Sequence, residues 1–153
     1  MRAINHALTG AIIGIVIGEP VVAIPLAIVS HFICDMIPHY GGGTPEAVEL
    51  KSALFNWLLI LDVVLCGALV GVLITVRPDH WLLAAICAFA AASPDFLSLP
   101  SYLRVKRGLP PKRDVIREFT VGIQWFQRPI GAVIDVVWFV AALVVLVPLI
   151  RYG

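Results

Sequence analysis

The sequence has few charged residues and few cysteines, and each scarcity excludes a class of protein. Charged residues make up 14% of the 153 residues and the net charge is +1, which argues against a nucleic-acid partner. The three cysteines, Cys34, Cys66 and Cys87, lie far apart within apolar runs. No CxxC motif predicts a zinc knuckle or a redox pair, and we interpret all three as buried thiols.

Apolar residues are abundant instead. Hydrophobic residues make up 60% of the chain, whereas about half of a soluble domain is apolar. Several apolar runs approach the length of about 20 residues that crosses a bilayer. The alternation that transmembrane strands require does not appear. We therefore predict an all-α integral membrane protein, folded as one compact domain over residues 1–153.

Five apolar segments predict a bundle of about five transmembrane or partly spanning helices. The segment that begins near the N-terminus is expected to be retained, because no small-residue cleavage site follows it. The first and fourth segments are short, so we expect them to be tilted or to cross only partly. The segments cover residues 5–18, 21–37, 52–76, 80–93 and 130–150.

Basic residues indicate the orientation of the bundle, because they are enriched on the cytoplasmic side of membrane proteins. If the N-terminus is inside, nine basic residues fall inside, and only Arg77 and Arg151 fall outside. This predicts an N-terminus inside and a C-terminus outside. The inside residues are Arg2, Lys51, Arg104, Lys106, Arg107, Lys112, Arg113, Arg117 and Arg128.

Residues 112–128 form an amphipathic stretch. Its apolar positions recur at helical spacing, and two arginines fall on the opposite side. This favours a helix that lies on the cytoplasmic membrane surface, and the alternative is a connector that packs on the bundle. The apolar positions are Ile116, Phe119, Ile123 and Phe126, and the arginines are Arg113 and Arg117.

Glycines repeat at steps of four near the N-terminus, at Gly10, Gly14 and Gly18. Small residues at this spacing allow membrane helices to approach closely. We expect them to mark a contact between helices of this chain. The alternative is the contact face of a homo-oligomer.

The stretch SHFICDMIPHYGGG, residues 30–43, places His31, Asp35 and His39 at steps of four. Residues four apart share a helix face, so His31 and Asp35 can bind one ion together. Because the residue before a proline disfavours helix, the helix is expected to end near Met36, with His39 on a turn beside the site.

Three further polar residues fall on the same side in this topology. His6 begins the first segment, Asp95 ends the fourth, and Asp62 lies about ten residues, or roughly 15 Å, into the third. A lone charge in hydrocarbon costs several kcal/mol, so such residues pair, bind an ion or line a wet cavity. We expect the partner of Asp62 to be one of the other candidates, His6, His31, Asp35 or Asp95.

Several carboxylates in one pocket repel each other unless a cation lies among them. Imidazole and carboxylate suit zinc, and also manganese or iron. We predict one or two divalent ions, zinc first, and a carboxylate that serves as general base. The predicted ligands are His6, His31, Asp35, His39, Asp62 and Asp95, and the predicted catalytic residues are Asp35, Asp62 and Asp95.

Interpretations without a metal remain open for each of these residues. His31 and Asp35 would form a buried hydrogen-bonded pair, and His39 would contact lipid headgroups. In the same interpretation His6 would only begin a helix, Asp95 would be a turn or cap residue, and Asp62 would make a structural hydrogen bond.

The pattern resembles a family of small prokaryotic inner-membrane metal-dependent hydrolases, one of which is LexA-regulated. The resemblance rests on NHALTG at residues 5–10, on Pro94-Asp95 at a helix end, and on the stretch from His31 to His39. The second aspartate of that family's PDxD element and its HRGxTHS-like segment are missing here. The family is distantly similar to zinc-dependent phospholipases C, which implies a lipid phosphoester as substrate and an inner-membrane location.

The sequence therefore predicts a hydrolase that acts on a lipid or another amphiphilic phosphoester at the cytoplasmic headgroup layer. Basic residues of the connecting segment would contact anionic headgroups. The alternatives are a structural or regulatory membrane protein without chemistry, and a cation or proton transport protein. The headgroup contacts are predicted at Arg104, Lys106, Arg107, Arg113 and Arg117.

Overall fold

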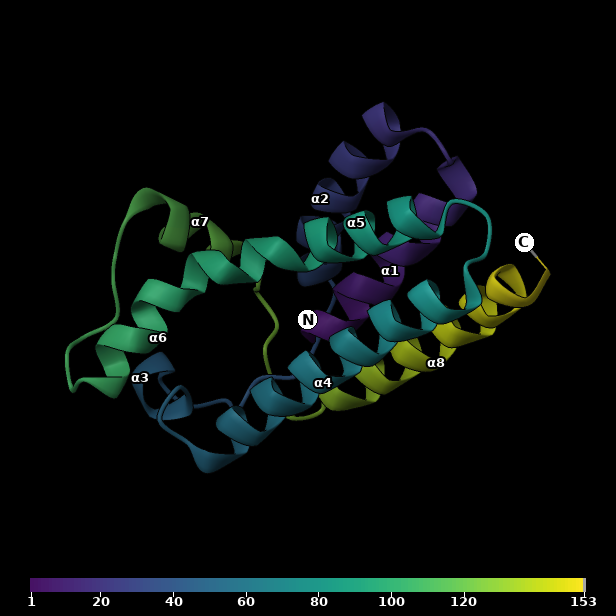
Figure 1. The fold of residues 1–153 in the computed structure, drawn as a ribbon. Helices are drawn as coiled ribbons and strands as arrows, with labels where there is room; N and C mark the ends of the chain where they lie inside the picture. The colour runs from purple at the N-terminus through teal and green to yellow at the C-terminus, as the bar shows by residue number, and fades with distance from the viewer. Residues whose placement is uncertain (153) are drawn as a thin grey trace.

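Helices make up almost all of the regular structure in the computed structural model, which describes residues 1–152 (Figure 1). The prediction of an all-α fold is confirmed. The helices are α1 (Ala3–Ile17), α2 (Pro20–Met36), α3 (Glu46–Glu49), α4 (Ala53–Val76), α5 (Trp81–Ala92), the 3-10 helix η1 (Ser93–Ser98), α6 (Leu99–Lys106), α7 (Val115–Ile123) and α8 (Gly131–Tyr152).

The five predicted apolar segments correspond to α1, α2, α4, α5 and α8. Within the described residues, three helical runs are long and apolar enough to cross a membrane: Ala53–Val76, Trp81–Lys106 and Gly131–Tyr152. The apolar helices α1 and α2 are shorter. Three spans are thus supported by length and composition, and five remain a prediction.

One predicted boundary is confirmed and one is wrong. The helix α5 ends at Ala92, near Pro94 as predicted, and the chain then continues through the 3-10 helix η1 into α6. The amphipathic stretch 112–128 is helical only as α7. Its last residues leave the helix because their backbone bonds to another segment: the amide of His39 donates to the Phe126 carbonyl, and that of Gly41 donates to the Arg128 carbonyl.

Capping side chains and a glycine set several of the helix ends. The side chain of Ser52 accepts from the amide of Phe55 at the start of α4, and that of Asp114 accepts from the amide of Arg117 at the start of α7. The helix α1 ends at Gly18, whose φ of 66° lies in the left-handed region.

The helix α1 lies at the centre of the bundle and contacts α2, α4, α5 and α8. Gly10 and Gly14 are packed against α5, near the backbone of Cys87 and of Ala84. The prediction of a helix contact within the chain is therefore confirmed, and α5 of the same chain covers the face that these two glycines form.

The direction of the helices brings distant polar residues to one level of the bundle. The helices α1 and α8 start there, and α2 and α5 end there, as the contacts of Asn5 with Asp135 and of His31 with Asp95 show. In Figure 1 the N-terminus lies near the middle of the molecule, and the C-terminus lies at one end, beside the last turn of α8.

Candidate metal site

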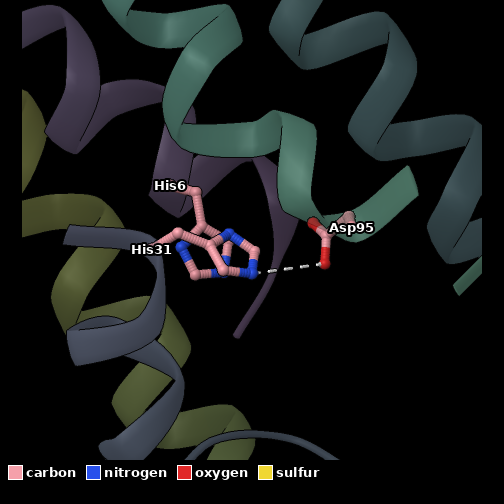
Figure 2. Close-up of side chains that lie close together, drawn as sticks. All are labelled: His6, His31 and Asp95. Atoms are coloured by element: carbon pink, nitrogen blue, oxygen red, sulfur yellow. Dashed lines mark ion pairs between the residues drawn. The ribbon is translucent and has the colours of Figure 1, made fainter. Parts of the chain in front are cut away.

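Two histidines and one aspartate from three helices converge at this level (Figure 2). His6 comes from α1, His31 from α2 and Asp95 from η1. The imidazole rings of His6 and His31 are stacked, with centroids 4.0 Å apart and planes inclined by 28°. One donor atom of each of the three residues lies within 4.8 Å of the other two. These residues therefore form a group that could hold a metal ion, which we call the His/His/Asp group.

Asp35 lies beside both histidines and is 2% exposed. Its Oδ1 is 3.1 Å from Nε2 of His6, and its Oδ2 is 3.4 Å from Nε2 of His31. The side-chain amide of Gln124 donates to Oδ2 over 2.7 Å, and the amino group of Met1 donates to Oδ1. Both oxygens of Asp35 are thus occupied by donors, which fixes the carboxylate against the two imidazoles.

A backbone contact selects the nitrogen of His31 that faces the group. Nδ1 of His31 lies 2.8 Å from the carbonyl oxygen of Ala91, in the last turn of α5. A carbonyl oxygen only accepts, so Nδ1 carries a proton and Nε2 is the nitrogen left to bind an ion. Contacts of this kind fix the ring orientation and the tautomer of histidines that bind metals.

The position of Asp95 follows from Pro94. A proline has no N–H, so the carbonyl of Ala90, four residues earlier, lacks its helical donor. The hydroxyl of Ser93 donates to that carbonyl over 2.9 Å, and the chain continues as the tighter helix η1. This brings Oδ1 of Asp95 to 4.0 Å from Nε2 of His31. The Asp95 side chain is 41% exposed, so the group is open to its surroundings on the side of Asp95.

The spacing of the donor atoms can be compared with the spacing that a small metal ion requires. Two ligands of a tetrahedral zinc, each about 2.0–2.1 Å from the ion, lie roughly 3.3 Å apart. The three donor atoms of the His/His/Asp group lie within 4.8 Å of one another, so they must approach by up to roughly 1.5 Å to bind one such ion. In addition, Nδ1 of His6 is buried without a hydrogen-bond partner among the described residues. Such an atom costs about 1–3 kcal/mol unless a water molecule or an ion satisfies it.

The structure does not bring His39 to the His/His/Asp group. His39 is buried on the turn after α2, and burial lowers its pKa, so its imidazole is neutral near pH 7. Its Nδ1 donates to the carbonyl of Ile37 over 2.7 Å, and its Nε2 accepts from the amide of Gln127 at 3.3 Å. Both nitrogens are therefore used within the chain, and the predicted ligand role of His39 is not supported by its position.

The predicted partners of Asp62 are wrong, because its carboxylate pairs with Arg2. Oδ1 of Asp62 lies 3.1 Å from a terminal nitrogen of Arg2 and accepts from Nε over 3.2 Å. The same guanidinium donates to the carbonyl of Leu58 over 2.8 Å. An arginine at this depth satisfies the carboxylate without a metal, so Asp62 ties the start of α1 to α4.

The five predicted headgroup contacts divide into two sets. The side chains of Arg104, Lys106, Arg107 and Arg113 are exposed, and the first two also bond within the chain, to the Pro110 carbonyl over 3.0 Å and to the side-chain oxygen of Asn56 over 2.9 Å. Arg117 is instead turned inward, where it pairs with Glu46 and donates to Ser98 over 2.6 Å. Arg117 is therefore not free to bind a headgroup.

Two residues at the site were missed by the sequence analysis, Gln124 and Arg2. Arg2 was counted only for topology, although a basic residue ahead of an apolar run is a suitable partner for a carboxylate at the same depth. Gln124 stands between Ile123 and Trp125, and a lone amide in an apolar stretch is the signal that could have identified it. Its contact with Asp35 is set by the turn after α7, which the sequence pattern did not predict.

No family model, curated protein or solved structure matches this chain. The resemblance to membrane metal-dependent hydrolases therefore remains a prediction from short motifs. The geometry of His6, His31, Asp35 and Asp95 supports the proposals below.

Proposed function

We propose that this protein is a membrane-embedded, metal-dependent hydrolase of a lipid or another amphiphilic phosphoester. The observation that carries the proposal is the His/His/Asp group, whose donor atoms lie within 4.8 Å of one another beside the buried Asp35. Two imidazoles and a carboxylate are the ligands of many catalytic zinc sites, which keep one position open. Apolar helices surround the group, which favours an amphiphilic substrate over a soluble one.

Each residue has a distinct task in this proposal. His6, His31 and Asp95 hold the ion, and the carboxylate of Asp35, which lies beside Nε2 of both histidines, adds negative charge that favours a cation there. A bound divalent ion would polarise a phosphoryl oxygen and lower the pKa of a water molecule. Oδ1 of Asp95 faces His31, and its Oδ2 has no hydrogen-bond partner among the described residues, so Oδ2 can accept the proton of an attacking water.

The setting that we propose is the inner membrane of a prokaryote, with the N-terminus in the cytoplasm and the C-terminus outside. The distribution of basic residues and the three long apolar helices support it. The exposed side chains of Arg104, Lys106, Arg107 and Arg113 would attract anionic lipids, at about 1 kcal/mol for each residue near the surface.

The metal content of the purified protein tests the proposal. We expect about one equivalent of zinc, manganese or iron in the wild type and a loss of most of it in His31→Gln, because glutamine lacks the imidazole lone pair. His39→Gln is the matched control, since it removes a buried histidine outside the group and should retain the metal. The measurement is inductively coupled plasma mass spectrometry, with circular dichroism to confirm folding.

Two results would contradict the proposal. One is a wild-type protein that binds none of the three metals after reconstitution with each in turn. The other is an equal loss of metal in His31→Gln and His39→Gln, which would mean that the ion does not lie among His6, His31 and Asp95.

A further inference from the structure

The helices around the His/His/Asp group do not end at the same level. The helices α1 and α2 have their near ends beside the group, whereas α4 and the run Trp81–Lys106 continue past it. Nine residues of α4 precede Asp62, and eleven residues of the other run follow Asp95. We call residues 53–61, residues 93–106 and α7 the collar. In Figure 1, α3, α6 and α7 occupy the end of the molecule opposite to the C-terminus.

Helix lengths show where a bilayer can end. The 15 residues of α1 span roughly 22 Å at about 1.5 Å per residue, which is about 8 Å less than the hydrocarbon core of a typical bilayer. The 24 residues of α4 span roughly 36 Å, which is sufficient. A bilayer that ended at the level of the group would therefore be too thin, and one that includes the collar has the ordinary thickness.

The outer surface of the collar is apolar. Trp57 on α4 is 69% exposed, Phe96 on η1 is 60% exposed and Val115 on α7 is 83% exposed. Water-exposed lobes rarely present so many large apolar side chains together, and such surfaces mark contact with a membrane or a partner. The further exposed apolar side chains are Leu54, Leu59, Ile60, Leu61, Leu97, Leu99, Leu103, Ile116, Phe119 and Val121.

Polar side chains hold the collar together from within. Asn56 on α4 accepts from the hydroxyl of Tyr102 over 3.2 Å at a partly buried contact, which joins α4 to α6. Arg117 in the same way joins α7 to η1 and α3. A protein in lipid has polar contacts inside and apolar side chains outside, whereas a protein in water buries its apolar side chains and exposes its polar ones.

Basic residues mark the tips of the collar. Lys51 precedes α4, Lys106 and Arg107 end α6, and Lys112 and Arg113 precede α7. All five side chains are exposed. Basic residues gather where membrane helices meet anionic headgroups, so these tips indicate the level of the cytoplasmic headgroups.

We propose that the acyl chains of the cytoplasmic leaflet cover the collar and that the His/His/Asp group lies about 10 Å below the hydrocarbon boundary. The sequence predicts a site at the cytoplasmic headgroup layer, and we propose this deeper position in its place. A substrate reaches the group laterally from the bilayer, as a lipid whose chains lie along the collar and whose polar group contacts Asp95. The depth rests on the membrane setting of the proposed function and not on its metal, and only the lateral entry of a substrate rests on its reaction as well.

The fluorescence of Trp57 reports how deep the collar lies in the bilayer. Trp57 lies five residues before Asp62, about 7 Å closer to the tips of the collar. The full chain is reconstituted in vesicles of phosphatidylcholine and phosphatidylglycerol. The fluorescence of Trp57 is obtained by subtracting the emission of Trp57→Phe from that of the wild type. Lipids brominated in the upper acyl chain are expected to quench most of this signal, and aqueous iodide is expected to leave it unchanged. Leu103→Trp in the Trp57→Phe background repeats the measurement on α6.

The inference is overturned if iodide quenches both Trp57 and the indole introduced by Leu103→Trp, because water would then cover the collar. It is also overturned if neither reagent quenches either indole, because a protein would then cover the collar. Trp138, the eighth residue of α8, separates this failure from that of the proposed function. Bromine that quenches Trp138 but not Trp57 would refute only the depth of the group. Bromine that quenches neither would refute the membrane setting itself.

Discussion

Replacing Gly10 with alanine is expected to destabilise the bundle by about 1–3 kcal/mol, whereas the same change at Gly67 is expected to stabilise it by up to about 1 kcal/mol. A Cβ at Gly10 would lie 2.2 Å from the carbonyl oxygen of Cys87, and a backbone atom cannot turn aside as a side chain can. A Cβ at Gly67 would meet nothing within 4 Å. Alanine there gains only its higher helix propensity.

Thermal unfolding in detergent, followed by circular dichroism, measures both changes. The two variants make the same substitution in two apolar helices, so the difference between them isolates the contact of α1 with α5. A midpoint for Gly10→Ala at or above that of the wild type would mean that these helices do not pack as described. The metal content of Gly10→Ala should fall with its stability, because α1 positions His6.

The consequence for the site is direct. His6 lies one turn before Gly10 on α1, and Ala91 lies one turn after Cys87 on α5. The carbonyl of Ala91 orients His31, so the close approach at Gly10 sets the distance between the two histidines. A glycine at this contact thus contributes to both the fold and the donor geometry.

Periodicity and polarity predicted the helices, because these features depend on each segment alone. The apolar runs that became α1, α2, α4, α5 and α8 are bounded by capping residues and prolines that act over one turn. The end of the amphipathic stretch could not be predicted in this way. Residues 126–128 leave the helix because they bond to His39 and Gly41, which are about 90 residues away in the sequence.

The candidate site was predictable only in part, for the same reason. Spacing placed His31 and Asp35 on one face, and topology placed His6 and Asp95 on the same side of the membrane. Neither argument gives the rotation of a helix about its axis. That rotation directs Asp62 toward Arg2 rather than toward the histidines, and it follows from packing among four helices.

The proposed hydrolase activity gives the largest expected effect: if the protein hydrolyses a lipid phosphoester as proposed, Asp95→Asn should lower that hydrolysis by about 100-fold or more. The substitution keeps the shape of the side chain, removes the charge that holds the ion and removes the oxygen that accepts a proton, and general bases contribute about 10²–10⁴-fold. Asp79→Asn is the control, because it makes the same change at an exposed position between α4 and α5.

The measurement is phosphate or alcohol release from a panel of phospholipids in mixed micelles, with the metal content of each preparation determined in parallel. Asp62→Asn separates turnover from folding: it breaks the pair with Arg2, so we expect a lower unfolding midpoint while the activity of each folded molecule changes much less than in Asp95→Asn. A loss of turnover in Asp62→Asn as large as in Asp95→Asn would contradict this assignment of the two carboxylates. If Asp95→Asn instead retains full activity, the chemistry does not occur at the His/His/Asp group, and any ion bound there only stabilises the contact between α1, α2 and η1.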